Sequence, residues 1–480
     1  MTRNVVPLIK KALLINPPTG ICFRDGRCQG SIELLTVQPE RIPLELAYMA
    51  AIIQGKGITT HLRDFPIERA TWGDVERELT EYIPDLLVVN VGSPTVDYDL
   101  SVCKLAKRIN PNMVTIAKGA HFDIFDMESL EKFPYLDLVI RHEVEAGMRD
   151  LLEKEDLELI PGITFRDKSN KIVKNPNRKL FKNIDSLPFP ARNLLKNHLY
   201  RRPDTGESLT VVMTSKGCPY NCVFCLAGEL SDYNLIVRNP FRVVDELEEC
   251  AKKYHIRNFF FYADTFTLKK DWVISLCEEI IRRNLKIRWA ANSRVDTLDE
   301  DRVRVMQKSG CEVIGFGIES GRQEILDKSK KGITLENSEN AIRLCKKYGI
   351  KSYMLFMIGF PWETREHIED TVNFAIKLNG DFADFNVVYP YPGTEMYKIA
   401  KELNLFDEGE LCGHDISRSM QRTLYLTTDE LAELRKYAIR RFYLRPGYLV
   451  KKLTQIRSPL EFKNYFAKGY HILKDIVLKK

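Results

Sequence analysis

The sequence predicts an α/β protein with three parts: an N-terminal doubly wound, Rossmann-like unit, a central partial TIM barrel of six βα repeats, and a small C-terminal helical region. Short strand-like apolar runs alternate with longer helix-like stretches, which is typical of parallel α/β architecture. A proline-punctuated stretch interrupts the alternation at 187–190, and after residue 394 the pattern turns helical and basic. A chain of 480 residues is long enough for two or three units that each bury a core.

The first unit, residues 1–160, is expected to be a five-stranded doubly wound sheet. Helical patterns at 44–54, 74–82 and 100–109 separate its strand-like runs. The expected strands are Ala12–Asn16, Thr59–Arg63, Leu86–Val91, Val114–Ala117 and Leu138–Ile140.

A linker is expected at residues 161–204. A hairpin-like pattern at Ile163–Val173 precedes the segment Leu187-Pro188-Phe189-Pro190. Such punctuation is typical of a connection between domains.

The central unit, residues 205–400, repeats a strand followed by a helix six times, which favours closure into a barrel or partial barrel. Ligands of such folds bind where the carboxyl ends of the strands meet the following loops. The expected strands are Leu209–Thr214, Phe259–Ala263, Ile287–Ala291, Val313–Ile318, Ser352–Ile358 and Phe385–Tyr389.

The last region, residues 401–480, is basic and helical in pattern. Although the whole chain carries a net charge of +6, residues 435–480 hold 13 Lys and Arg against two acidic residues. A basic, aromatic-rich amphipathic stretch could lie on an anionic membrane surface or face an acidic or lipid-like substrate. We favour a helical cap whose aromatics pack on the barrel. The apolar residues that recur at helical spacing in this region are Leu431, Leu434, Ala438, Phe442 and Leu449.

The chain is expected to work in the cytoplasm, with peripheral membrane contact through the basic region as the alternative. No apolar run could span a bilayer, and the N-terminus does not resemble a signal peptide. Eleven cysteines, an odd number without a secretory signal, argue against a disulfide framework. Nucleic acid is not an expected partner, because no RNA-binding module accompanies the charge.

Most cysteines outside the central cluster are best interpreted as small buried hydrophobes. Cys103, Cys250, Cys277 and Cys345 fall on apolar helix faces, and Cys311 opens a strand. An auxiliary metal at Cys22 with Cys28, or at Cys412 beside His414, is the less favoured alternative. One cluster is expected.

The strongest chemical signal is a cysteine loop after the first strand of the central unit. Cys218, Cys222 and Cys225 lie within eight residues. Thiolates suit iron–sulfur clusters, and a four-iron cubane normally takes four of them. Three cysteines therefore leave one iron open to bind a substrate. A zinc site would need a fourth ligand, and the nearest downstream candidates, Cys250 and His255, lie in or just past a helix whose apolar face explains them better.

This loop, Lys216-Gly217-Cys218-Pro219-Tyr220-Asn221-Cys222-Val223-Phe224-Cys225, resembles the CxxxCxΦC motif of the radical SAM superfamily, with Phe224 as the aromatic residue. The resemblance covers about residues 205–400. It implies a [4Fe–4S] cluster whose open iron chelates the amino and carboxylate groups of S-adenosylmethionine. It also implies that one electron from the cluster splits the sulfonium to a 5′-deoxyadenosyl radical.

Other strand ends fit the same superfamily. The resemblance implies that Asp264 contacts the methionine amine and that Glu319 contacts the ribose hydroxyls or the sulfonium. Glycines at strand ends let backbone approach a cofactor closely, although Gly and Pro after a strand often mark only a turn. The cofactor-binding candidates at these ends are Asp264, Asn292, Ser293, Arg294, Gly315, Gly317 and Glu319.

The first unit resembles the cobalamin-binding half of the B12-dependent radical SAM class. Its match covers about residues 10–155 and implies cobalamin binding at strand ends, where cofactors of doubly wound sheets dock. Two departures stand against it: the Asp-x-His-x-x-Gly motif is absent, and Arg141-His142-Glu143-Val144-Glu145 replaces a Gly-Glu-Gly-Glu motif. A Rossmann domain without cofactor is the alternative. The candidate contacts are Asn16, Pro17, Ser93, Pro94, Thr95, Gly119 and His121, of which His121 could instead cap a helix or simply be exposed.

Together these resemblances imply a cobalamin-dependent radical SAM enzyme that methylates an unactivated carbon of a small or lipid-like substrate and takes electrons from a flavodoxin or ferredoxin. An oxidative cyclase or rearrangement enzyme of the same class is one alternative. A non-catalytic cobalamin or iron–sulfur sensor is the other.

Overall fold

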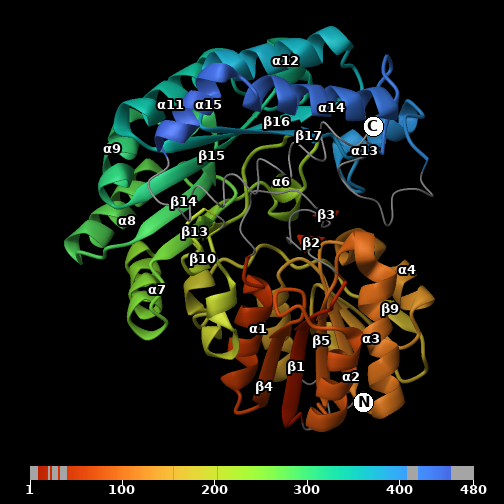
Figure 1. Ribbon diagram of the computed structural model, residues 1–480. Coiled ribbons are helices and arrows are strands. Elements are labelled where there is room, and N and C mark those ends of the chain that lie inside the picture. The colour runs from red at the N-terminus through yellow and green to blue at the C-terminus, as the bar shows by residue number, and fades with distance from the viewer. Residues whose placement is uncertain are drawn as a thin grey trace.

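The chain folds into two large β-sheets covered by helices, one mixed and one parallel, as Figure 1 shows for this computed structural model. The structure describes residues 9–19, 22–23, 31–32, 41–154, 156–202, 204–407 and 420–455. Among these residues, no helix is long and apolar enough to cross a membrane.

The first sheet has seven strands in the order β4-β1-β5-β6-β7-β8-β9. Its five parallel strands are those predicted: β1 (Lys11–Asn16), β4 (Thr59–Asp64), β5 (Leu86–Asn90), β6 (Val114–Lys118) and β7 (Leu138–Ile140). The expected five-stranded sheet is too small, because the hairpin placed in the linker forms β8 (Ile163–Arg166) and β9 (Ile172–Lys174) and continues the sheet antiparallel to β7. Ile163, Thr164 and Phe165 of β8 are buried, as expected for a strand inside a covered sheet.

Helices cover both faces of this sheet, and the two cores alternate along each strand. Ala12 and Leu14 of β1 belong to one buried cluster, whereas Leu13 and Ile15 belong to the other. This alternation follows from the two-residue period of a strand buried on both faces. The helices are α1 (Leu44–Gln54), α2 (Trp72–Tyr82), α3 (Val96–Ile109), α4 (Phe122–Lys132) and α5 (Val144–Glu153).

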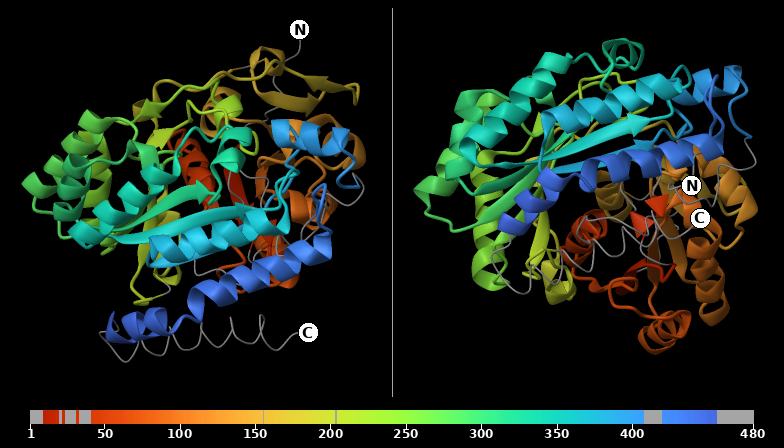
Figure 2. Two further views of the ribbon diagram at one scale, coloured as in Figure 1. Left: turned by 90° about the horizontal axis from the view of Figure 1, so that it is seen from above. Right: turned by 45° about the horizontal axis from the view of Figure 1, so that its top comes forward.

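The second sheet has six parallel strands in sequential order, with β10 and β17 at its two edges. It is therefore a partial barrel, as predicted, and it curves under an arch of helices (Figure 2). The strands are β10 (Leu209–Met213), β13 (Asn258–Tyr262), β14 (Arg288–Ser293), β15 (Cys311–Glu319), β16 (Lys351–Ile358) and β17 (Phe382–Val387). The helices are α7 (Pro240–Lys253), α8 (Lys270–Arg282), α9 (Glu300–Lys308), α10 (Gln323–Lys328), α11 (Leu335–Tyr348) and α12 (Arg365–Leu378).

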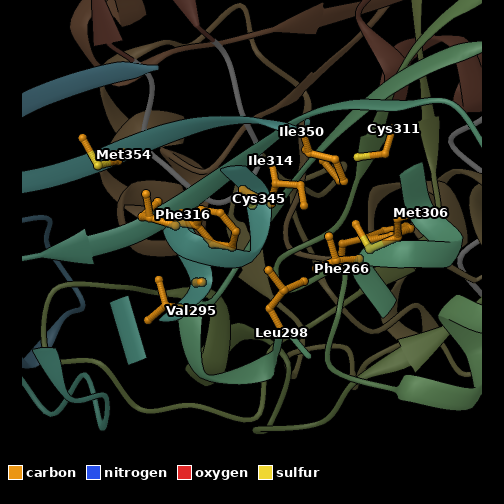
Figure 3. Close-up of a cluster of buried hydrophobic side chains, with 14 of the residues drawn as sticks. Phe266, Val295, Leu298, Met306, Cys311, Ile314, Phe316, Cys345, Ile350 and Met354 are labelled. Carbon is orange, nitrogen blue, oxygen red and sulfur yellow. The ribbon is translucent and has the colours of Figure 1, made fainter. Parts of the chain in front are cut away.

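The core between this sheet and its helices is dense and apolar. Figure 3 shows Phe316 and Ile314 of β15 beside Met354 of β16 and Val295 and Leu298 of the loop after β14. The five cysteines interpreted as buried hydrophobes are indeed buried, whereas Cys22, Cys28, Cys412 and His414 lie outside the residues whose side chains are described.

The C-terminal helices α13 (Glu395–Glu402), α14 (Thr428–Tyr443) and α15 (Pro446–Gln455) include the predicted cap. Helix α14 packs on β17 and α12, and its aromatic Phe442 lies in the same core as Phe385. Leu449, expected on the same apolar face, is exposed, because α15 begins at Pro446 and turns that residue outward.

Candidate active site

The cysteine loop leaves the second sheet between β11 (Ser215–Lys216) and α6 (Ala227–Leu230). None of its three cysteines forms a disulfide. Cys218 and Cys222 are half-buried, and Cys225 is exposed. The sulfurs are thus reachable from outside the core, unlike the buried cysteines of the helices.

The backbone of this loop is held at its first residues. The Gly217 N–H donates to Asp264 Oδ2 at the end of β13 (3.0 Å), and the Cys218 N–H donates to Ser231 Oγ (3.1 Å). Gly217 has φ +88°, and a Cβ there would overlap the carbonyl oxygen of Asn234. Only glycine fits this conformation without displacing the loop.

The remainder of the loop forms a turn around Cys225. The Cys225 N–H donates to the Cys222 carbonyl (3.1 Å), and the Ala227 N–H donates to Cys225 Sγ (3.4 Å). Hydrogen bonds of this kind to cluster sulfurs tune a bound iron–sulfur group. Phe224 packs edge-on against Phe360, with ring centroids 5.9 Å apart.

The donor set fits a cubane cluster better than a single metal ion. The loop from Cys218 to Cys225 offers three thiolates and no histidine or carboxylate, and thiolates are the ligands of iron–sulfur clusters. The irons of a cubane take one terminal thiolate each, so its cysteines need not converge on a point. Burial, with the negative charges of Asp264 and Cys222 adding to it, raises the pKa of the Cys218 thiol. A bound metal would therefore be needed to keep that sulfur deprotonated at neutral pH.

The ends of β14 and β15 bring several predicted residues together. A Cβ at Gly315 would overlap Asn292 Oδ1, and one at Gly317 would overlap Glu319 Oε1. The glycines therefore make room for the Asn292 and Glu319 side chains, where we expected them to make room for a cofactor directly. Ser293 is buried and hydrogen-bonded to Thr267.

Arg294 faces the cysteine loop. Its guanidinium lies 3.6 Å from the centroid of the Tyr220 ring, between Cys218 and Cys222 in sequence. It also donates to Asp296 (2.9 Å) and to the Lys331 carbonyl (2.8 Å). Arg294 thus fixes two loops against each other.

At the carboxyl edge of the first sheet, Asn16 belongs to a buried polar chain, directly before Pro17. Its amide donates to Asp64 Oδ1 (3.1 Å) and its oxygen accepts from Asn90 (2.7 Å). Tyr200 of the connecting segment donates to Asp64 Oδ2 (2.8 Å). This chain ties three strand ends to the segment that leads into the second sheet.

The loop after β5 meets the loop after β6. His121 is hydrogen-bonded through Nδ1 to Ser93 Oγ (3.0 Å) and through Nε2 to Ser129 Oγ (3.2 Å). Burial lowers the pKa of His121 to about 4. The alternative of an exposed His121 is therefore wrong, and its side chain makes no helix-capping hydrogen bond.

The neighbouring candidates are also engaged in local structure. Pro94 and Thr95 belong to a 3-10 turn at Ser93–Thr95, and Thr95 donates to Asp99 Oδ2 (2.6 Å). Gly119 has φ +146°, and a Cβ there would overlap the Val91 carbonyl oxygen. Close packing of two strand-end loops explains this glycine.

Comparisons with known proteins agree with the two halves of this site. Residues 212–375 match the radical SAM superfamily and residues 30–152 match the B12 binding domain. The chain is 32% identical over 451 residues to an uncharacterised methyltransferase of Pyrococcus horikoshii. The alignment covers 93% of this chain and 95% of the relative. The chain belongs to the cobalamin-dependent radical SAM family.

Two further comparisons place this radical SAM protein among its relatives. It is 25% identical over 425 residues to the anaerobic magnesium-protoporphyrin IX monomethyl ester cyclase of Rubrivivax gelatinosus, covering 86% of this chain and 76% of the cyclase. A solved structure of the cobalamin-dependent S-adenosylmethionine radical enzyme OxsB superimposes with a TM-score of 0.71 at 17% identity, covering 98% of this chain and 72% of OxsB. The predicted fold class is confirmed.

The family also confirms the predicted cofactors. A radical SAM domain uses a [4Fe–4S] cluster and S-adenosylmethionine, and a B12 binding domain uses cobalamin. The radical SAM protein is accordingly an enzyme whose cofactors carry the difficult chemistry.

Two lysines of this radical SAM protein were missed from the sequence. Lys331 is buried and its Nζ lies 2.7 Å from Glu319 Oε1. Burial alone would lower the pKa of Lys331, but the negative charges of Glu319 and Cys222 raise it above its usual value. In the sequence it belongs to a pair of lysines before Gly332. Such a pair is also common in surface loops, so it does not indicate a buried lysine.

The second missed lysine is Lys216, directly before Gly217. It pairs with Glu143 and Glu145 of the first unit. These are the two glutamates of the segment that departs from the Gly-Glu-Gly-Glu motif, so the departure keeps both carboxylates. The spacing of the glutamates was visible in the sequence, but their distant partner was not.

Proposed function

We propose that this protein is a methyltransferase that cleaves S-adenosylmethionine reductively at a [4Fe–4S] cluster and methylates an unactivated carbon of a small or lipid-like substrate. A [4Fe–4S] cluster held by the cysteine loop would supply the electron for reductive cleavage, and cobalamin held by the first unit would supply the methyl group. The observation that carries the proposal is the loop with three cysteines outside the buried core, none of them in a disulfide, at the carboxyl edge of the second sheet. The methyltransferase of Pyrococcus horikoshii supports methylation as the outcome.

In this proposal the residues of the second sheet hold the cluster and S-adenosylmethionine. The iron ligands are Cys218, Cys222 and Cys225. Phe224, which lies between the last two of them in sequence, packs against Phe360. Asp264 and Glu319 lie at the ends of β13 and β15, on the edge where ligands of parallel sheets bind. The accompanying contacts to S-adenosylmethionine are Asn292, Ser293, Arg294, Gly315 and Gly317.

The first sheet would hold cobalamin at its own carboxyl edge, through Asn16, Pro17, Ser93, Pro94, Thr95, Gly119 and His121. His121 is held between two serines, and burial keeps it neutral at pH 7. In this proposal it contacts the corrin as a neutral side chain. We retain 1–160, 161–204, 205–400 and 401–480 as the proposed domain boundaries, with β8 and β9 as an extension of the first sheet.

The proposed partners are a substrate and a reductant such as flavodoxin or ferredoxin. The proposed compartment is the cytoplasm, and the proposal includes no nucleic acid. Contact of the basic region with a membrane surface stays a proposal, because much of that region lies outside the described residues. The second candidate function, oxidative cyclisation without methyl transfer, is supported by the likeness to the Rubrivivax cyclase.

Replacing Cys222 with alanine tests the ligand assignment. C222A should lose the cluster and 5′-deoxyadenosine formation while still binding cobalamin, because the change leaves two thiolates in the loop and does not touch the first sheet. Iron and sulfide analysis, 5′-deoxyadenosine assay and absorbance of bound cobalamin measure these three properties. C250A, at a buried cysteine of α7, is the matched control and should keep all three. A C222A protein that still forms 5′-deoxyadenosine would show that the ligands are assigned wrongly.

Isotopic label separates methylation from cyclisation. With S-adenosylmethionine labelled in its methyl group, a methyltransferase passes the label to cobalamin and then to product. If turnover releases 5′-deoxyadenosine while the label stays in S-adenosylmethionine and methionine, the cyclase function replaces the proposed one. If the reduced, reconstituted protein releases no 5′-deoxyadenosine with any partner, the sensor hypothesis gains instead.

A further inference from the structure

One buried ion pair joins the two sheets directly beside the cluster loop. Lys216 lies two residues before Cys218, and its Nζ is 2.6 Å from Glu145 Oε2 and 3.3 Å from Glu143 Oε2. Glu145 lies in the first turn of α5, and Glu143 precedes that helix after β7. The cysteine loop is therefore connected by a side chain to the carboxyl edge of the first sheet.

The pair is shielded from water. The side chains are 15% exposed for Lys216, 10% for Glu143 and 2% for Glu145. Charges in such surroundings interact more strongly than on a surface, and removing one leaves the other poorly compensated.

The backbone next to Lys216 is fixed from the other side. Lys216 pairs with Ile236 in the short antiparallel ladder of β11 and β12 (Ile236–Val237), and the Gly217 N–H donates to Asp264 at the end of β13. The first unit thus holds the side chain of Lys216. Strand β12 pairs with its backbone, and Asp264 after β13 of the second sheet holds the next residue, Gly217. A shift of α5 would pull on the residue that leads directly into the first cysteine.

Other contacts at the same level show that the two edges face each other closely. Gly393, in the loop after β17, leaves room for Ile124 of α4 and lies near Leu226 beside the last cysteine. Lys118 at the end of β6 is paired with Glu45, so that lysine already has an acidic partner of its own. Lys216, at the start of the cysteine loop, is paired instead with Glu143 and Glu145 at the beginning of α5.

We propose that Lys216 is a positioning residue that transmits the placement of the first, cobalamin-binding sheet to the cluster loop. Its pair with Glu145 and Glu143 sets the position of the cysteine loop relative to the carboxyl edge of the first sheet, where cobalamin would be held in the proposed function. This inference rests on the proposed function. Lys216 itself touches no reacting atom.

The test compares K216M with the wild-type protein after anaerobic reconstitution. Both should bind the same iron and sulfide, because K216M keeps all three cysteines. The EPR spectrum of the reduced cluster, recorded with and without S-adenosylmethionine, should differ between them. The 5′-deoxyadenosine formed per cluster should fall by about 10- to 100-fold, the usual effect of losing a residue that orients a metal site. K216R keeps the charge and should restore most of both properties.

Two further variants make the test specific. E145Q should reproduce the effect of K216M, and the double variant should lose no more than either single one, because the two residues act through one interaction. E145Q also carries the test if K216M fails to fold. K196M is the matched control: it removes the exposed Lys196, which pairs with Glu68 of the first unit from the connecting segment and not from the cluster loop, and it should leave spectrum and activity unchanged.

An unchanged EPR spectrum and unchanged 5′-deoxyadenosine formation in K216M would overturn the inference. So would independent, additive losses in K216M and E145Q. A wild-type protein without any cluster would instead refute the proposed function, so the two failures are distinguishable.

Discussion

At the scale of single residues, the site is organised by charges buried beside the cysteine loop. Lys331 and Glu319 are 9% and 8% exposed and lie 2.7 Å apart. Glu319 also adopts φ +66°, where non-glycine residues are rare. Such backbone conformations persist only where the surroundings enforce them, and the shift of register between β15 and β16 at Gly317 and Glu319 marks the same place.

Breaking the buried pair should be costly. K331M leaves the Glu319 carboxylate buried without its partner, so we expect a loss of about 3–5 kcal/mol in the free energy of unfolding. The adjacent Lys330 pairs with Glu395 at the surface, so K330M should cost under about 1 kcal/mol. Urea unfolding of both variants measures the difference. Equal losses would mean that Lys331 and Glu319 do not form a buried pair.

His121 should make stability depend on pH. Its folded pKa is lowered to about 4 by burial, whereas the unfolded chain has the usual value of about 6.5. Between these values the unfolded state binds the additional proton, so stability falls as the pH drops from about 6.5 to about 4, by up to roughly 3 kcal/mol. H121N should flatten this part of the stability profile, and H198N, at an exposed histidine, should not. If stability depended on pH as steeply in H121N as in the wild-type protein, the claim that His121 is buried and neutral would be wrong.

At the scale of elements, the cluster loop depends on one glycine. G217A should displace the loop, because Gly217 has φ +88° and a Cβ would overlap the Asn234 carbonyl. Iron and sulfide per chain should therefore fall after reconstitution. Gly349, which ends α11 at φ +70° with open space around it, is the control. G349A should lose some stability but keep its cluster. Equal cluster content in the two variants would show that the loop tolerates a side chain at 217.

Most elements could be predicted from the sequence because their signals are local. Helix α1 lies at the predicted residues 44–54, and each of the eleven predicted strands is present within a few residues. The role of the hairpin β8–β9 could not be predicted in the same way. Whether a hairpin joins a sheet depends on the edge that it meets, here that of β7, and no local pattern reports that edge.

The same distinction between local patterns and contacts of distant segments applies to the candidate site. The cysteine loop and the glycines of strand ends have fixed spacing, so the sequence contains them. Lys331 and Lys216 are ordinary lysines until the fold buries them beside Glu319 and Glu145. Their roles depend on residues 12 and 71 positions away, and separation of that kind is invisible to a motif.

At the scale of the whole molecule, two parallel sheets present their carboxyl edges to each other. Helices α4 and α5, which follow β6 and β7 of the first sheet, approach the segments after β17 and β10 of the second, through Ile124 with Gly393 and through Glu145 with Lys216. Each edge is where a parallel sheet binds its ligands. The two edges that would hold cobalamin and the cluster in the proposed function therefore face each other.

The most direct test of this account is the metal content of the cysteine loop in the wild-type protein, purified anaerobically and reduced. The account predicts about four irons and four sulfides per chain, with an EPR signal of a reduced [4Fe–4S] cluster that changes when S-adenosylmethionine is added. Zinc in place of iron, or a loop without metal, would contradict it.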